Sequence, residues 1–241
     1  MMKGKTMKRI LITNDDGIQA SGIIRLADAA RFFGEVTVIA PETECSAMSH
    51  SITIREPIDL FPYAFPVPDI TAWSCSGTPS DCVRIALSYL LPHKPDFVLS
   101  GINYGWNIAS DIQYSATVGA AMEAAHDGIP SFAFSEPHHP DHSVTDRYLQ
   151  AVLSDVLNET PERDTILNVN FPLASCAGFL KGRTVSSGSA YQSRYKLAEK
   201  LSGNGLRLTS DGIPDNACED GSDLKALLDH YISIGVVKNI G

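Results

Sequence analysis

The sequence predicts an α/β protein with a mostly parallel sheet and helices on both faces, followed by a smaller, irregular β-rich C-terminal appendage. Two observations carry this prediction. Short apolar runs, typical of strands buried on both faces, alternate with segments whose apolar residues recur at helical spacing. After about residue 173 this alternation ends, and Gly, Ser, Asn and Asp become frequent. Strands separated by helices imply right-handed crossovers and therefore a parallel sheet.

The first part of the chain opens with a strand, a helix and a second strand. Helix 22–33 is predicted because Ile23, Leu26, Ala27 and Ala30 share one face. The elements expected here are a strand over 8–13, a helix over 22–33 ended by Gly34, a strand over 36–40, a polar loop over 41–51, an extended proline-rich segment over 52–70 and a short strand over 72–75.

The second part continues the alternation and then loses it. Its expected elements are a helix over 80–91, a strand over 97–100, a loop over 101–107, a helix over 116–127, a strand over 131–134, a helix over 145–158, a strand over 166–170, and short strand candidates at 182–185, 206–209 and 231–237. We therefore divide the chain into a disordered leader (1–6), a core (7–172) and a β-rich appendage (173–241), which is a candidate dimerisation element.

Composition and charge exclude several classes of protein. Of 241 residues, 44% are hydrophobic and 20% are charged, as in globular domains. A net charge of -9 is not the footprint of a protein that binds duplex nucleic acid, and no apolar run approaches the roughly 20 residues of a membrane span. The 5 cysteines form no C-x-x-C pair, which argues against a disulfide framework or a zinc site. We expect a cytoplasmic protein.

The run I-L-I-T-N-D-D-G at 10–17 places Asn14, Asp15 and Asp16 directly after the first strand. Ligands of open α/β sheets bind outside the carboxyl ends of the strands. Two adjacent carboxylates repel each other there, and Mg²⁺ or Mn²⁺ relieves this repulsion because both prefer oxygen ligands. The alternative interpretation is a plain strand-to-helix turn in which Asp16 caps the helix.

Other strand ends carry similar chemistry. The loop after the second strand contains Ser46, Ser49, His50 and Ser51, and the strand at 97–100 brings Ser100, Gly101 and Asn103. These loops can converge on one crevice, where two carboxylates, a hydroxyl and an amide oxygen would suit one divalent cation with open positions for water and substrate.

Ser115 and Thr117 stand at the start of the helix predicted over 116–127. Hydroxylated residues at a helix N-terminus suit a phosphate group, because free N–H groups and the helix dipole favour an anion. The alternative interpretation is a plain N-cap.

For three further features we favour a structural interpretation. The run T-P-S-D at 78–81 is typical of a helix start with an early proline. His50 is a lone loop histidine. His138, His139 and His142 lie in a proline-rich loop without the spacing of a zinc site.

The common nucleotide and esterase fingerprints do not occur. The chain has no G-x-G-x-x-G after its first strand, no G-x-x-x-x-G-K-[ST] and no G-x-S-x-G. This argues against a dinucleotide-dependent oxidoreductase, a P-loop NTPase and an esterase of the α/β-hydrolase type.

Six collinear motifs between residues 8 and 172 resemble the survival protein SurE family. They are T-N-D-D-G-I at 13–18, V-I-A-P at 38–41 with S-x-x-S-H-S-I-T at 46–53, G-T-P-S-D-C at 77–82, S-G-I-N-x-G-x-N at 100–107, Y-S-A-T-V-x-A-A-M-E-A at 114–124 and L-N-V-N-F-P at 167–172. Several strand-end motifs in the right order are far more specific than any single one.

The resemblance implies a Rossmann-like core and a metal-dependent phosphatase that hydrolyses nucleoside 5′-monophosphates; some relatives also act on 3′-nucleotides or short polyphosphate. The family's metal ligands fall on Asp15, Asp16, Ser46 and Asn103. A role of Asp15 as a base or nucleophile is left open, and we expect Asn14, Gly101, Ser115 and Thr117 to position the phosphate. Direct attack by water is favoured, because the aspartates are adjacent and lack the D-x-D spacing of aspartyl-phosphate enzymes.

The sequence departs from the family pattern at two glycines, which are Ala47 and Ala116 here. These changes put the rate or the substrate preference in doubt more than metal binding. The C-terminal motifs at 221–223 and 230–234 match weakly, and the chain stops where relatives continue into a segment that packs against a partner. We expect a homodimer, with a tetramer left open.

Two rival functions remain at this point. A receiver module would need a phospho-accepting Asp after a later strand, and Asp111, the nearby candidate, lies too far into its loop. A catalytically weak nucleotide-binding protein is kept open by the two glycine losses. Turnover in the presence of metal separates this second rival from an enzyme.

Overall fold

The computed structural model describes residues 7–239, so the predicted leader at 1–6 lies outside the described residues. Nine strands form the main sheet: β1 (Lys8–Thr13), β2 (Gly34–Pro41), β3 (Leu60–Pro62), β4 (Thr71–Cys75), β5 (Phe97–Tyr104), β6 (Ser131–Glu136), β7 (Thr165–Asn170), β8 (Phe179–Arg183) and β13 (Ile232–Lys238). The helices are α1 (Ser21–Ala30), α2 (Pro79–Ile85), α3 (Ala116–His126), α4 (Ser143–Val156) and α5 (Asp223–Leu228), with a π-helical turn η1 (Ala86–Leu90) and a 3₁₀ helix η2 (Ala109–Tyr114).

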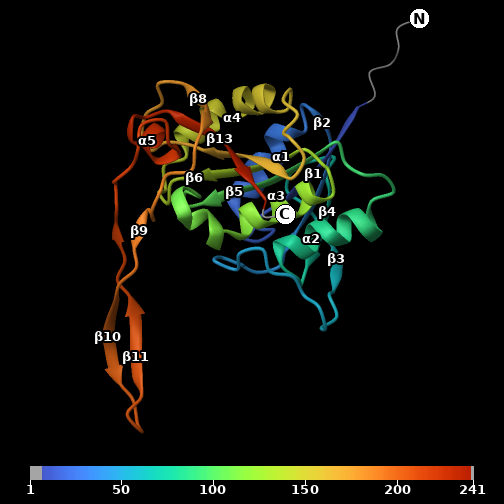
Figure 1. The fold of residues 1–241 in the computed structure, drawn as a ribbon. Coiled ribbons are helices and arrows are strands. Elements are labelled where there is room, and N and C mark those ends of the chain that lie inside the picture. Colours follow the sequence, from blue (N-terminus) through green and yellow to red (C-terminus); the bar gives the residue numbers. More distant parts are fainter. Residues whose placement is uncertain (1–6, 240–241) are drawn as a thin grey trace, which may run out of the picture.

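The strand order is β3-β4-β2-β1-β5-β6-β7-β13-β8 (Figure 1). The six strands from β4 to β7 are parallel, whereas β3 pairs antiparallel with β4 and β13 pairs antiparallel with β7. The predicted fold class, a mostly parallel α/β sheet with a smaller β-rich C-terminal region, is confirmed.

Helices cover both faces of the sheet. Along β1, Ile10 and Ile12 pack with α1 and α4, whereas Leu11 points to the other face and packs with α2 and α3. Successive side chains of a strand alternate between faces, so a strand covered on both sides must be apolar throughout. The continuous apolar runs of the sequence therefore identify the central strands correctly.

The sheet reverses its order beside β1, and this reversal places the site. From β1 the chain builds β2 and β4 on one side, then returns to lay β5 on the other side of β1. The gap between the carboxyl ends of β1 and β5 is thus the topological switch point, where open sheets bind ligands. Asp15 and Asp16 follow β1 there, and Asn103 lies near the end of β5.

Some element boundaries differ from the prediction. The first helix ends at Ala30, and Gly34 begins β2 instead of ending the helix. The helix predicted over 80–91 is α-helical only in Pro79–Ile85 and continues as the π-helical turn η1. Residues 101–104, predicted as loop, are the end of β5, which pairs with β6 through a register shift between Ser100 and Asn103. Polar residues end the apolar run there without ending the strand.

The segment after residue 172 divides between the sheet and a projecting arm. β8 and β13 lie in the main sheet, and α5 packs against β13. The remaining strands, β9 (Tyr191–Gln192), β10 (Tyr195–Lys200), β11 (Leu206–Ser210) and β12 (Ile213–Pro214), form two small antiparallel pairs. We call residues 191–214 the arm, because β10 and β11 extend away from the body (Figure 1). Within residues 7–239, no helix has the length and apolar character needed to cross a membrane.

Candidate active site

A pocket of about 200 Å³ opens at the switch point, and we call it the site pocket. Its lining comes from the loops after β1 and β2, the end of β5 and the loop after it, the 3₁₀ helix η2 and the N-cap of α3. It consists of Asp15, Ser46, Ala47, Asn103, Tyr104, Asn107, Asp111, Tyr114 and Ser115. Three of the four predicted metal ligands, which are far apart in the sequence, therefore meet in one pocket.

Asp15 is the buried carboxylate of this pocket. Its side chain is almost fully enclosed, and one carboxylate oxygen accepts the hydroxyl hydrogen of Thr117 in α3. Burial, assisted by repulsion from Asp16, raises the pKa of Asp15 from 3.8 to about 6. A bound cation would reverse this effect, because it would favour the ionised carboxylate.

Asp16 follows Asp15 in the same turn but lines a different hollow. Its Oδ2 accepts the Tyr104 backbone N–H at 3.0 Å, and burial raises the pKa of Asp16. Asp16 lines a neighbouring hollow of about 270 Å³, together with Tyr104, Glu136 and His142. The two aspartates thus border adjoining hollows at one edge of the sheet.

The loop after β2 carries Ser46 and is joined to the Asp15 turn. The backbone N–H of Cys45 donates to the backbone carbonyl of Asp15 at 2.7 Å. Ser46 is exposed, and its hydroxyl donates to Glu44 at 2.6 Å. Ala47 has a φ of 57°, a left-handed conformation that costs an L-residue roughly 1–2 kcal/mol. Ala47 is one of the two positions where the family resemblance implies a glycine.

Asn103 is brought to the pocket by the irregular end of β5. Its side-chain nitrogen donates to the carbonyl of Gly105 at 2.7 Å. This orientation leaves the amide oxygen as the atom that could ligate a cation, as an oxygen-preferring metal requires.

Of the four predicted phosphate-binding residues, only Ser115 lines the site pocket. It is the N-cap of α3, and its hydroxyl accepts the Val118 N–H at 3.1 Å, so the N-terminus of α3 borders the pocket. Thr117 is buried beneath Asp15, as described above. Asn14 is buried and its amide donates to Gly17, whereas Gly101 lies inside β5, where an added Cβ would be 2.4 Å from the Phe134 carbonyl oxygen.

An asparagine network that sequence reasoning did not assign supports the pocket wall. The Asn107 side chain donates to Ser135 at 2.8 Å, and the Asn107 backbone carbonyl accepts from the side chains of Asn168 and Asn170 of β7 at 2.8 and 3.0 Å. All three asparagines stand in the motifs quoted above. The signal that could have exposed them is amides at buried strand positions, which need partners.

A larger pocket of about 520 Å³ adjoins the site pocket, and we call it the side pocket. Asp111 and Tyr114 line both. The side pocket is rich in rings from the core and from the base of the arm, namely Trp106, Tyr114, His138, His139 and Tyr191. His138 and His139 are exposed, and they border a hollow beside the site.

The donor set fits a hard divalent cation. The predicted ligands offer two carboxylates, a hydroxyl and an amide oxygen, all of them oxygen donors. In the described part of the chain, no three His, Cys, Asp or Glu residues gather closely enough to hold a metal by themselves. A cation here would therefore depend on neutral oxygens and water besides the two aspartates, as Mg²⁺ does in many sites.

Comparison with known proteins supports the sequence resemblance. The family model described as survival protein SurE matches residues 10–194. A 5′-nucleotidase SurE of Alkaliphilus metalliredigens (strain QYMF) is 40% identical over 235 residues, which cover 94% of this chain and 91% of that protein. A 5′-nucleotidase SurE of Synechococcus sp. (strain JA-3-3Ab) is 37% identical over 234 residues, covering 93% and 89%. The crystal structure of the SurE protein from Aquifex aeolicus has a TM-score of 0.80 and 33% identity, with 95% and 93% coverage.

Proposed function

Because this chain belongs to the survival protein SurE family, we propose that it is a metal-dependent 5′-nucleotidase, which hydrolyses nucleoside 5′-monophosphates to nucleoside and phosphate. One observation carries the proposal beyond family membership. Asp15, Ser46 and Asn103 come from three different strand ends, yet they line one pocket beside the N-terminus of α3. Cation ligands next to a helix N-terminus suit a phosphate ester.

Asp15, Asp16, Ser46 and Asn103 would hold one Mg²⁺ or Mn²⁺. When bound, the cation would supply charge neutralisation at the phosphoryl oxygens and would make a water molecule more acidic. Thr117 fixes the orientation of the Asp15 carboxylate, and Ser115 directs the N-terminus of α3 toward the phosphate. Asn14 and Gly101 would act from behind the pocket, by holding the turn and the strand that carry the ligands. We keep direct attack by water as the favoured route.

The side pocket is the proposed nucleoside site. It adjoins the site pocket, and its aromatic rings can stack on a base, an interaction worth about 1–3 kcal/mol per base in other proteins. Asp111, which lines both pockets, would accept a ribose hydroxyl. The phosphate and the nucleoside would then occupy neighbouring hollows of one continuous site.

We further propose a homodimer, with residues 7–172 as the phosphatase core and the C-terminal part of the chain as the dimerisation element. The support is the arm, on which Tyr195, Leu197, Leu206 and Leu208 are exposed. Unpaired apolar residues on a projecting hairpin are typical of an association surface. A reducing cytoplasm stays the proposed location, on the ground of the cysteine pattern.

The test is phosphate release from a panel of nucleoside 5′- and 3′-monophosphates, tripolyphosphate and p-nitrophenyl phosphate, with Mn²⁺, Mg²⁺ or EDTA. We expect metal-dependent release, highest with one or more 5′-monophosphates, and a loss of about a thousandfold or more in Asp15→Asn, since a member of the catalytic unit is removed. Asp96→Asn is the matched control, because Asp96 directly precedes β5 at its amino end, away from the site pocket. Absence of release with every metal, in a protein that is folded, would overturn the proposal.

A further inference from the structure

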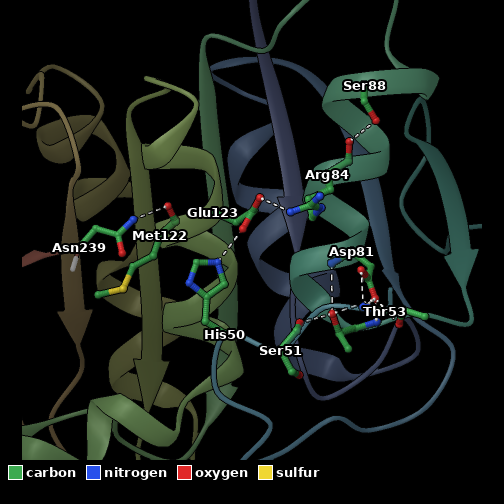
Figure 2. A network of polar contacts seen from close by, with 10 residues as sticks. His50, Ser51, Thr53, Asp81, Arg84, Ser88, Met122, Glu123 and Asn239 are labelled. Carbon is green, nitrogen blue, oxygen red and sulfur yellow. Dashed lines mark hydrogen bonds and ion pairs between the residues drawn. The ribbon is translucent and has the colours of Figure 1, made fainter. Parts of the chain in front are cut away.

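The loop that carries Ser46 is fixed at its far end by side chains that the mechanism above does not use. Figure 2 shows these contacts between the loop and the helices α2 and α3. The loop needs such support, because Ala47 and Ser49 both hold left-handed backbone, with φ values of 57° and 54°. Two such residues within three positions are costly for a free loop, so neighbouring structure must hold them.

Asp81 provides the first anchor. Its carboxylate is buried and accepts the Thr53 backbone N–H at 3.0 Å and the Thr53 hydroxyl at 2.7 Å. It also accepts the Thr78 N–H at 3.0 Å, as the acidic member of the capping box of α2. The Thr78 hydroxyl in turn donates to the Ser51 carbonyl at 2.7 Å. The start of α2 thus holds the backbone of residues 51 and 53 through a buried, charge-assisted network.

Glu123 on α3 provides the second anchor. It pairs with His50 at 2.7 Å and with Arg84 of α2 at 3.4 Å, and the hydrogen bond from His50 lowers the pKa of the Glu123 carboxyl. The backbone of the loop also lies directly on α3, since an added Cβ at Gly119 would be 2.7 Å from the Ser49 carbonyl oxygen. Any side chain at position 119 would therefore push the loop off the helix.

We propose that Asp81 and Glu123 are positioning residues, which hold the segment 49–53 against α2 and α3 and thereby fix Ser46 beside Asp15. The proposal rests on the proposed function, because it gives Ser46 its position for the cation. At the near end of the loop, the Cys45 N–H is hydrogen-bonded to the Asp15 carbonyl. At the far end, the Thr53 N–H is hydrogen-bonded to Asp81 at the start of α2. With both ends fixed, the strained residues 47 and 49 have no freedom to relax, and Ser46 is held at the pocket.

The test changes Thr53, the loop residue that Asp81 holds, so that the capping of α2 by Thr78 and Asp81 stays intact. Thr53→Val removes one hydroxyl donor to Asp81, and Thr53→Ser keeps it. Two quantities are measured on the full chain: the Kd for Mn²⁺ by calorimetry without substrate, and amide hydrogen exchange of residues 46–53 in EDTA. We expect Thr53→Val to weaken Mn²⁺ binding about threefold and to speed the exchange, and Thr53→Ser to behave like the wild type.

Asp81→Asn should have the larger effect, an increase of about tenfold in the Kd for Mn²⁺, because outer residues that orient metal ligands commonly have effects of this size. Hydrolysis should recover at high Mn²⁺ concentration, which a variant that is merely unfolded would not show. Asp96→Asn removes a carboxylate that accepts the Arg9 N–H at 2.8 Å, away from the site, and serves as the control.

The proposal would be overturned if Thr53→Val and Asp81→Asn lowered only the Tm and left both the Mn²⁺ affinity and the exchange of residues 46–53 unchanged. Asp81 would then be a helix cap and nothing more. A wild-type chain that bound no Mn²⁺ would overturn the proposed function and the positioning of Ser46 for a cation. Unequal exchange in the Thr53 pair would, in that case, show that Asp81 orders the loop for another purpose.

Discussion

Strands β6 and β7, beside the site, are buried at every residue, whereas every residue of β10 and β11 in the arm is exposed. The buried strands find their partners within the chain, and their positions follow from the packing of one core. The arm has antiparallel hydrogen bonds but no core of its own, and a two-stranded hairpin alone is marginally stable in water. The difference teaches that the strands beside the site are held by packing within the chain, whereas the residues of β10 and β11 have no such packing.

Removal of the β10–β11 hairpin, the outer part of the arm, tests the comparison most severely. Arg194 and Asp211 are already hydrogen-bonded across the base of the hairpin, with the Asp211 N–H donating to the Arg194 carbonyl at 2.8 Å. Residues 195–210 can therefore be replaced by an Asn-Gly turn, which suits a two-residue hairpin connection. We expect the wild type to be a dimer and the shortened chain a monomer at micromolar concentration by light scattering, a change of at least about a hundredfold in the dimer Kd.

Release of phosphate from p-nitrophenyl phosphate is the control for the core in this experiment, because that ester needs only the site pocket. The shortened chain should retain this activity. A shortened chain that remained a dimer would place the association surface on the body of the molecule. A shortened chain that lost all activity would mean that the arm also helps to build the site.

The second prediction concerns how the burial of Asp15 changes the stability of the metal-free protein with pH. Folding raises the pKa of Asp15 from 3.8 to about 6, so the folded state favours the protonated carboxyl. Compared with an ionised Asp15, the protonated carboxyl stabilises the folded state. This contribution to the free energy of unfolding is fully present below pH 4 and is lost as the pH rises through about 6. The loss amounts to about 3 kcal/mol, from 1.36 kcal/mol for each pKa unit.

Urea unfolding in EDTA between pH 4 and pH 7.5 measures this effect. Other carboxyl groups titrate in the same range, so the informative quantity is the difference between the wild type and Asp15→Asn. Asp15→Asn should gain stability relative to the wild type as the pH rises, and saturating Mn²⁺ at pH 7 should reverse the order. Curves that stay parallel throughout would show that Asp15 is not a strained, buried charge.

The residues of the candidate site could be singled out from the sequence because each of them follows closely on an apolar run. An apolar run that ends in Asp15 and Asp16 marks both a buried strand and a ligand edge, and Ser46 and Asn103 follow the same rule. The four ligands that the family resemblance implies are among the residues that the strand-end argument singles out. The ligand roles of those residues stay predictions. Asn14, Gly101 and Thr117, predicted to bind the phosphate, do not line the site pocket, and the roles we propose for them are supporting ones.

What the sequence could not supply depends on distant partners. The run at 78–81 predicts a helix start, and Thr78 and Asp81 do cap α2. Their second task depends on Thr53, which is 28 residues away from Asp81 and meets it only in three dimensions. Likewise, 231–237 predicts a strand, but no local pattern tells that β13 would pair with β7 in the main sheet.

The smallest effects are expected at Ala47 and Ala116, the two positions where the family resemblance implies a glycine. Ala47 has a left-handed φ of 57°, so Ala47→Gly should remove strain of roughly 1–2 kcal/mol and lose part of it to the greater freedom of the unfolded chain, for a net gain of about 0.5–1 kcal/mol. Ala116 is the buried first residue of α3, where Ala116→Gly should cost about 1 kcal/mol. Urea unfolding of the two variants in EDTA checks the opposite signs. Equal signs would mean that residue 47 is not held in the strained conformation that the anchors on α2 and α3 are proposed to maintain. The position of Ser46 would then depend less on these two helices than we propose.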